Sequence, residues 1–192
     1  MNRIEDDRVA FYLKHQERIE EWAALAEDSS EIAHDFLCSL ADDLNQLVVH
    51  LGATVRLDND SAHASWPSYL LALPEWYASS TGDLRAAIAL GWHKDSSLCF
   101  TIPNRCAVTG VWANKDLDGG GELSKELKAT FMEAGILRER GLSTSVWWPA
   151  YQSQIAKGEF WKDLLPYRKQ ILDSIRCVWT DFMPHLQKVL AL

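Results

Sequence analysis

The spacing of apolar residues changes twice along this chain of 192 residues, and each change indicates a different kind of secondary structure. Up to about residue 52, apolar residues recur every three or four positions, as they do on one face of a helix. Residues 53–115 contain short apolar runs bounded by turn residues, which are typical of strands. From residue 122 onward the helical spacing returns. This order of elements predicts an α+β fold in a single domain over residues 1–192.

Residues 4–27 and 31–51 are expected to form two amphipathic helices, the acidic helical arm of the chain. Their apolar stripe consists of Tyr12, Ile19, Trp22, Ala26, Ala33, Phe36, Leu40, Leu44, Leu47 and Leu51. Asp28, followed three residues later by Glu31, resembles a capping box that would restart a helix. We therefore predict an N-terminal helical hairpin over residues 1–52, with the stripe packed on its own domain rather than forming a dimer seam. Nothing between the two helices forces a turn, so one long helix is the alternative.

The middle of the chain predicts four strands. They are "ATVRL" (53–57), "SYLLAL" (68–73), "RAAIALGW" (85–92) and "AVTGVWAN" (107–114). No helical pattern lies between them, which favours an antiparallel meander over residues 53–115. The C-terminal part, residues 116–192, is expected to pack three helices on this sheet, at 122–135, at 155–165 and in a long helix from Pro166.

The charge of the chain is unevenly distributed. Residues 1–60 contain 14 Asp and Glu against 5 Lys and Arg, whereas the remaining residues are close to neutral. Because an acidic segment repels phosphate, this distribution argues against nucleic-acid binding by residues 1–60. A basic protein partner and solvated helix faces would both account for the acidity.

The chain opens on the charged "MNRIEDDRVA" and contains no run of about 18 apolar residues, so we expect neither a secretory signal nor a membrane span. Its cysteines are scattered without a CxxC pair, as Cys38, Cys99, Cys106 and Cys177. Free thiols are typical of a reducing compartment. We therefore predict a cytoplasmic protein without a cofactor.

The stretch "NKDLDGGGELSKE" (114–126) is partly similar to a calcium-binding loop. Asn114, Asp116 and Asp118 occupy the first three ligand positions of an EF-hand, and Gly119 stands where that loop turns. The bidentate glutamate that closes the coordination shell is replaced by Lys125. These residues are thus a weak metal candidate, and we expect a glycine-rich turn that leads into a helix.

No sequence motif for nucleophilic catalysis, for a phosphate-binding loop or for a zinc site occurs in the chain. The acids of residues 114–126 leave one enzymatic alternative, a divergent metal-dependent nuclease. It would use Asp116, Asp118 and Glu122 together with Lys94 or Lys115. Whether the protein is an enzyme stays open at this point, and the absence of a convergent catalytic set favours a non-enzyme.

The chain is rich in tryptophan, with nine in total, and "SVWWPAYQSQIAKGEFWKDLLPY" (145–167) is its most aromatic stretch. Such clusters form core anchors, interfaces or pocket walls. The predicted partner-binding residues are Trp147, Trp148, Tyr151, Phe160 and Trp161. Adjacent tryptophans on regular structure point to opposite sides, so we expect one of Trp147 and Trp148 to anchor the last helices on the sheet. The other would face solvent or a partner.

Residues 84–192 resemble a C-terminal region of bacterial PD-(D/E)XK nuclease-family proteins from defence or prophage loci. The resemblance lies in the strand "AAIAL", the strand "TGVW", the amphipathic helix, the "WWP" element and the short helix "KGEFWKDL". The acids and the lysine of the catalytic core are not found in order. The resemblance therefore implies an accessory region of bacterial or phage origin without the catalytic core.

These observations predict a non-enzymatic protein-interaction or regulatory component, which a bacterial or phage defence-related system would use. Its partner would be another protein or further copies of itself. The alternatives are the divergent nuclease and a small-ligand sensor with a Trp-lined pocket.

Overall fold

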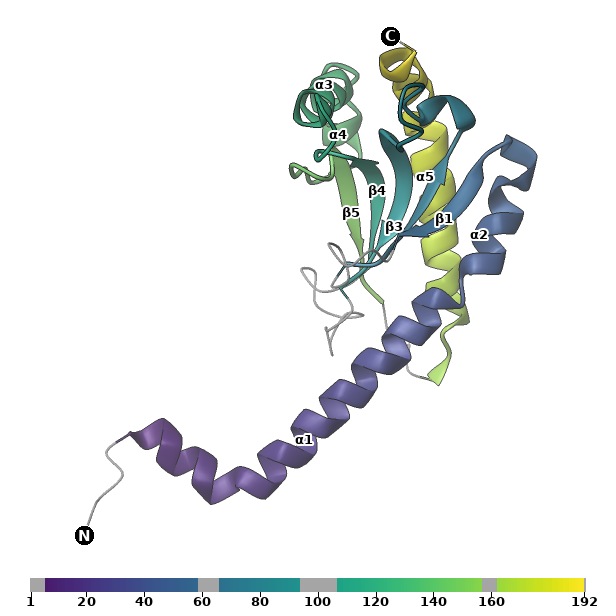
Figure 1. The fold of residues 1–192 in the computed structure, drawn as a ribbon. Coiled ribbons are helices and arrows are strands. Elements are labelled where there is room, and N and C mark those ends of the chain that lie inside the picture. The colour runs from purple at the N-terminus through teal and green to yellow at the C-terminus, as the bar shows by residue number, and fades with distance from the viewer. Residues whose placement is uncertain (1–5, 59–65, 94–106, 157–161, 192) are drawn as a thin grey trace.

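The structure, a computed structural model, describes residues 6–58, 66–93, 107–156 and 162–191. Its helices are α1 (Asp7–Cys38), α2 (Ala41–Val48), α3 (Gly120–Glu133), α4 (Ile136–Glu139) and α5 (Leu165–Leu190), with short 3-10 helices at η1 (Val49–Leu51) and η2 (Pro74–Trp76). Its strands are β1 (Thr54–Asp58), β2 (Ser68–Ala72), β3 (Ala86–Gly91), β4 (Ala107–Ala113) and β5 (Ala150–Gln154). Figure 1 shows one helix crossing a sheet and another projecting away from it.

The strands form one antiparallel sheet in the order of the chain, β1-β2-β3-β4-β5. All residues of β2, β3 and β4 are buried, which explains why these segments are continuous apolar runs rather than alternating patterns. The predicted α+β class and the antiparallel meander are confirmed. The first four strands lie within one or two residues of their expected positions.

The expected number of four strands is wrong, because β5 adds a fifth. Its sequence, "AYQSQ", lies in the expected C-terminal helical part, residues 116–192, and carries little apolar signal. The side chain of Gln154 is nevertheless buried and hydrogen-bonded against α5. Hydrogen bonding thus replaces apolar burial on this strand, and a search for hydrophobic patterns misses it.

The expected hairpin over residues 1–52 is also wrong. One helix, α1, runs without a break from Asp7 to Cys38 and ends where the backbone N–H of Ser39 donates to the carbonyl of Asp35 at 2.9 Å. No Gly or Pro occurs in α1, and the exposed Asp28 and Glu31 lie within the helix instead of capping a second one. The alternative of a single long helix holds up to residue 38.

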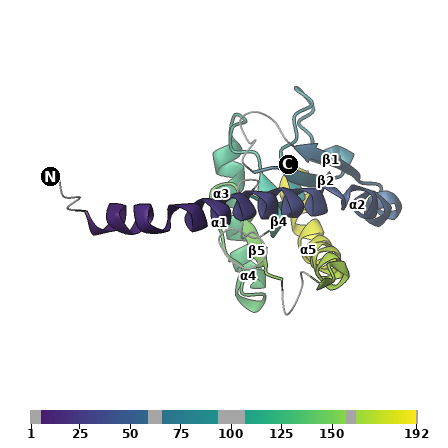
Figure 2. The same cartoon turned by 90° about the horizontal axis from the view of Figure 1, so that it is seen from below.

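Only the last part of α1 packs on the domain. Ala33 and Leu37 are buried, and the buried stripe continues through Leu40, Leu44 and Val48 of the α2 region. Among the side chains that the structure describes in residues 7–32, none is buried. Figures 1 and 2 show this part of α1 extending far from the sheet. The prediction that the whole stripe packs on its own domain is therefore wrong for the described stripe residues Tyr12, Ile19 and Trp22, none of which is buried.

Two hydrogen bonds join the end of α1 to the sheet. The hydroxyl of Tyr69 on β2 donates to the carbonyl of Cys38 at 2.7 Å, and the indole Nε1 of Trp92 donates to Nδ1 of His34 at 3.0 Å. Burial raises the pKa of the Tyr69 hydroxyl, and the nearby Cys38 and Asp42 add to that rise. The neutral hydroxyl is the form that can donate this bond.

Helix α5 covers one face of the sheet (Figure 1). Its apolar contribution to the core is made by Ile171, Ile175, Val178, Trp179, Phe182 and Leu186. Two C-terminal helices, α3 and α5, occupy expected positions, and α4 is an additional short one. The expected helix at 155–165 includes residues 157–161, which lie outside the described residues.

A buried polar group links α5 to the sheet at its centre. Ser174 Oγ of α5 lies 2.6 Å from Thr109 Oγ1 of β4, and Gln154 Nε2 of β5 donates to these two oxygens at 2.9 and 2.8 Å. The hydroxyl of Tyr167 donates to the Gln154 carbonyl at 2.5 Å. Neighbouring residues on a strand point to opposite faces of the sheet. Because Thr109 faces α5, Val108 and Gly110 lie on the face away from α5.

We expect Ser174→Ala to lower the free energy of unfolding by about 1–3 kcal/mol, because it leaves buried donors without their acceptor. The matched control is Thr180→Ala on the exposed side of the same helix, for which a change within about 0.5 kcal/mol is expected. Urea-induced unfolding measures both variants. Equal losses would contradict a special role for the buried group.

Candidate functional site

The sheet face opposite α5 is lined along its centre by small residues. The register places Gly91 of β3 between Ser68 of β2 and Val108 of β4, and Ala89 between Leu70 and Gly110. Small side chains leave space above a sheet that larger neighbours can wall in. On this face the small residues Gly91 and Ala89 therefore form a depression along β3, which is called the floor of the pocket below.

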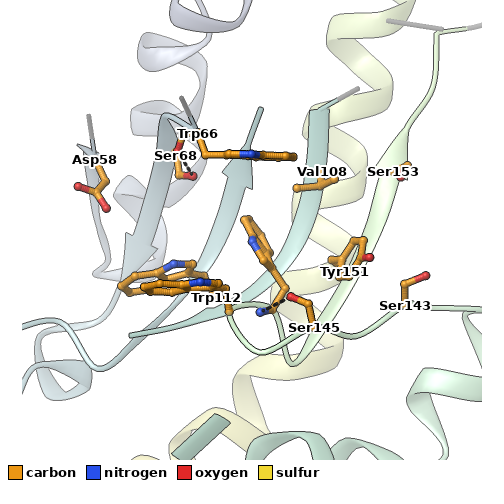
Figure 3. Close-up of a pocket in the computed structure, with 11 residues that line it drawn as sticks. Asp58, Trp66, Ser68, Val108, Trp112, Ser143, Ser145, Tyr151 and Ser153 are labelled. Carbon is orange, nitrogen blue, oxygen red and sulfur yellow. Dashed lines mark hydrogen bonds between the residues drawn. The ribbon is translucent and has the colours of Figure 1, made fainter. Parts of the chain in front are cut away.

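A pocket of about 510 Å³ lies on this face, within the size range of small-molecule sites. Its lining side chains are Asp58, Trp66, Ser68, Val108, Trp112, Ser143, Ser145, Trp147, Trp148, Tyr151 and Ser153. Figure 3 shows Trp66 and Trp112 on opposite sides of the hollow, with Asp58 at one end and Tyr151 at the other. Four strands and the α4–β5 connection thus contribute to one aromatic pocket.

Trp148 reaches across the sheet to β3. A Cβ added at Gly91 would lie 2.9 Å from the Trp148 ring and 2.8 Å from Ser68 Oγ, closer than real Cβ contacts. The ring of Trp148 also meets Tyr151 edge-on, with centroids 6.4 Å apart. Glycine at position 91 therefore allows the indole to lie directly on the floor of the pocket.

Trp147 forms a second wall together with Trp112. Their rings are stacked with centroids 6.5 Å apart and an interplanar angle of 17°. The ammonium of Lys115 lies 4.3 Å from the centroid of the Trp147 ring, a cation–π contact. The backbone N–H of Ala113 donates to the Trp147 carbonyl at 3.0 Å, which holds this connection against the end of β4.

The connection before β5 is further held by side chains. Ser124 Oγ of α3 donates to the Val146 carbonyl at 2.7 Å, and the backbone N–H of Trp148 donates to Ser145 Oγ at 3.1 Å. The backbone N–H of Ser145 returns a bond to the Trp148 carbonyl at 2.8 Å. Both adjacent tryptophans are consequently positioned by local hydrogen bonds rather than by a regular strand.

The pocket is electron-rich. Aromatic faces carry partial negative charge, and Asp58 adds a carboxylate at the end of β1. Within the set of described lining residues, Asp58 is the one with a formal charge at neutral pH, and the other polar groups are hydroxyls. The arrangement favours ligands that are cationic or flat and disfavours phosphates.

Three of the five predicted partner-binding residues meet in this pocket, namely Trp147, Trp148 and Tyr151. Phe160 and Trp161 lie outside the described residues. We expected one of the two adjacent tryptophans to anchor the last helices, whereas both line the pocket on the face away from α5. Residues 144–149 contain no regular strand, so the alternation rule behind that expectation does not apply to them.

Sequence reasoning missed Trp66 and Trp112 as site residues. Trp112 follows Val108 and Gly110 at a spacing of two, and this spacing places all three on the same face of β4. That signal was present in "AVTGVWA". For Trp66, which lies two residues before β2 begins, the sequence offers no comparable signal.

The stretch 114–126 consists of a tight turn over residues 114–119 and the first turns of α3. A Cβ at Gly120 would overlap the Asn114 carbonyl oxygen at 2.0 Å, and Asn114 Oδ1 accepts the backbone N–H of Asp116 at 3.2 Å. Gly119 begins α3 with a φ of +74°, a value that favours glycine. The glycines therefore serve the change from β4 to α3.

The carboxylates of this loop do not gather around one point in the structure. Asp116 and Asp118 are exposed, and Glu122 pairs with Lys125 at 2.6 Å. No group of three His, Cys, Asp or Glu side chains suited to a metal ion occurs among the residues that the structure describes. Lys94, the lysine of the nuclease alternative, lies outside the described residues.

Comparison of the chain with models of protein families, with curated proteins and with solved structures found no significant match. In the described part of the chain, none of the helices has the length and apolar character needed to span a membrane.

We expect Gly91→Ala to displace the Trp148 indole, because the new methyl group would collide with it. The near-ultraviolet circular dichroism should change, and stability should fall by about 1–3 kcal/mol as in other overpacked sites. The control is Gly121→Ala in the first turn of α3, where a Cβ meets no atom within 4 Å. That variant should keep the spectrum and match or exceed the parent stability. A Gly91→Ala spectrum identical to the parent's would contradict the placement of Trp148.

Proposed function

We propose that this protein is a non-enzymatic regulatory component that binds an organic cation in the aromatic pocket. The observation that carries this proposal is a pocket of about 510 Å³ with tryptophan walls, in which Asp58 is the one carboxylate among the described lining residues. Of the functions considered from the sequence, the small-ligand sensor with a Trp-lined pocket therefore has the best geometric support. A protein partner for the sensor stays a prediction. The relationship to accessory regions of PD-(D/E)XK nuclease-family proteins, which the resemblance implies, also stays a prediction.

The cation is favoured by electrostatics. A methylated or delocalised cation gains about 0.5–2 kcal/mol from each aromatic face that it contacts, and the gain is larger where water is excluded. The ammonium of Lys115 already lies 4.3 Å from the centroid of the Trp147 ring, so the cation–π contribution to ligand binding is assigned to the other indoles of the pocket. Asp58 would add a charge–charge attraction at the opposite end from Tyr151 (Figure 3).

Phosphate-bearing ligands fit the pocket poorly. Such ligands need Lys, Arg or clustered backbone N–H donors, and neither Lys nor Arg is among the described lining residues. The formal net charge of −8 repels them as well. This supports an organic cation over a nucleotide or a nucleic acid.

Binding is proposed rather than catalysis because of the side chains that surround Asp58. General acid–base chemistry uses pairs of titratable groups whose environments separate their roles. Beside Asp58, the described lining residues include no second carboxylate, histidine, cysteine or lysine. Hydroxyls and indoles suit the positioning of a ligand.

The test is calorimetric titration with choline and N-methylpyridinium, each compared with a neutral molecule of the same shape, 3,3-dimethylbutan-1-ol and toluene. We expect each cation to bind at least about tenfold more tightly than its neutral counterpart, a difference of about 1.4 kcal/mol. Asp58→Asn should reduce that difference, and the part that remains should come from the aromatic faces. Trp148→Ala should weaken the binding of both cations. Trp22→Ala, which removes an exposed tryptophan far from the pocket, should leave their binding unchanged.

Two outcomes would contradict the proposal. If the neutral molecules bind as tightly as the cations, the pocket is a general apolar site. If neither cation produces heat or a change in tryptophan emission at millimolar concentration, the cation class is wrong.

A further inference from the structure

The sheet face that carries the pocket has a second charged residue besides Asp58. Along β1, one residue separates Arg56 from Asp58, so both side chains lie on the same face. The residue between them, Leu57, is paired with Tyr69, whose side chain bonds to the end of α1 on the opposite face. Arg56 therefore belongs to the pocket face, about 7 Å along β1 from Asp58.

The strand register shows where Arg56 lies relative to the pocket. Two neighbouring rows of residues cross the five strands on this face. The first row consists of Asp58, Ser68, Gly91, Val108 and Ser153, and the second consists of Arg56, Leu70, Ala89, Gly110 and Tyr151. Tyr151 lines the pocket at the β5 end of the second row, and Arg56 lies at its β1 end. Because β1 is the edge strand and Arg56 is exposed, this guanidinium lies at the rim of the pocket, beside the end that Asp58 forms (Figure 3).

Both charges at the rim are available to a ligand. Among the described residues, neither Arg56 nor Asp58 forms a salt bridge, whether with each other or with a third side chain. By contrast, Arg140 pairs with Asp181 and Arg168 pairs with Asp43. A guanidinium and a carboxylate thus lie close together at the rim without a direct contact between them.

These two charges act in opposite ways on a ligand with a single positive charge. Asp58 attracts such a ligand and Arg56 repels it, so part of the attraction is cancelled. A ligand that also carries a negative group gains from both charges when its cation lies toward Asp58 and its anion toward Arg56. The rim therefore favours a zwitterion over a simple cation.

We propose that the pocket binds zwitterions in which an organic cation is joined to a carboxylate, as in a betaine or an N-alkylated pyridine carboxylate. This inference rests on the proposed function, because the tryptophan walls and Asp58 take the cation. The Arg56 guanidinium donates to the carboxylate, whose two oxygens match its paired N–H groups. A single guanidinium beside Asp58 does not suit a phosphate, since the carboxylate repels a multiply charged anion more strongly.

A charged residue on an edge strand also has a purely structural use, because it discourages pairing of that strand with another chain. That use of Arg56 involves no ligand. It predicts equal affinity for two ligands that differ only in whether they carry a carboxylate. Binding of matched ligands therefore separates the two roles.

The experiment is calorimetric titration of the full chain with two matched pairs of ligands. The first pair is N-methylpyridinium and its 3-carboxylate, N-methylnicotinate. The second is butyltrimethylammonium and 4-(trimethylammonio)butanoate, in which a carboxylate replaces the terminal methyl group. We expect each zwitterion to bind at least about fivefold more tightly than its simple cation, because a charge-assisted hydrogen bond is added at a partly solvated position.

Arg56→Gln should bring the two members of each pair to within about twofold of each other. The simple cations should bind this variant at least as tightly as the parent, since a repelling charge is removed. The matched control is Arg176→Gln, which makes the same change at an exposed position of α5, on the other face of the sheet. It should keep the full preference for zwitterions. Far-ultraviolet circular dichroism checks that both variants are folded.

Asp58→Asn gives a second, independent measurement. It should weaken the zwitterion and the simple cation of each pair alike, because Asp58 contacts the part that they share. The ratio between the two should stay within about twofold of the parent ratio.

Equal affinity for both members of each pair would overturn the zwitterion inference and would leave the proposed cation site intact. A preference for zwitterions that persists in Arg56→Gln would overturn the role of Arg56. If none of the four ligands binds, the proposed function fails together with this inference, so the two failures are distinguishable.

Discussion

The contact of Ser174 with Thr109 and Gln154 is the interaction on which the two faces of the sheet depend. It fixes where α5 crosses the strands, because a buried hydroxyl and a buried amide are stable only where their hydrogen bonds are satisfied. A shift of α5 along the sheet would leave these buried groups without their partners, which costs about 1–3 kcal/mol for each group. Because α5 covers one face, the residues of β4 that alternate with Thr109, such as Val108 and Gly110, form part of the other face.

The pocket on that other face follows from the size of the residues on β3. Gly91 and Ala89 leave a low floor, and indoles from the flanking segments lie over it. The tryptophans of this chain therefore divide between two roles. Trp76 and Trp179 stack in the core, with ring centroids 5.6 Å apart, whereas Trp66, Trp112, Trp147 and Trp148 line the pocket.

The base of the arm and the floor of the pocket belong to the same two strands. Ser68 lines the pocket, and its neighbour Tyr69 holds the end of α1 from the opposite face. In the same way, Gly91 lies under Trp148 while the next residue, Trp92, donates to His34 of α1. The end of α1 and the pocket thus lie on opposite faces of the same sheet.

The sequence by itself determined the α+β class, the four apolar strands, and the helices at α3 and α5, because each depends on local periodicity and turn residues. It also indicated that "WWPAY" matters, without indicating how. Only the tertiary structure decided that β5 joins the sheet, since its buried amide acts through partners distant in the chain. Likewise, it decided that both Trp147 and Trp148 face the pocket, and that none of the described side chains of residues 7–32 is buried. Local patterns report which side of an element is apolar, but what covers that side depends on the three-dimensional arrangement of the whole chain.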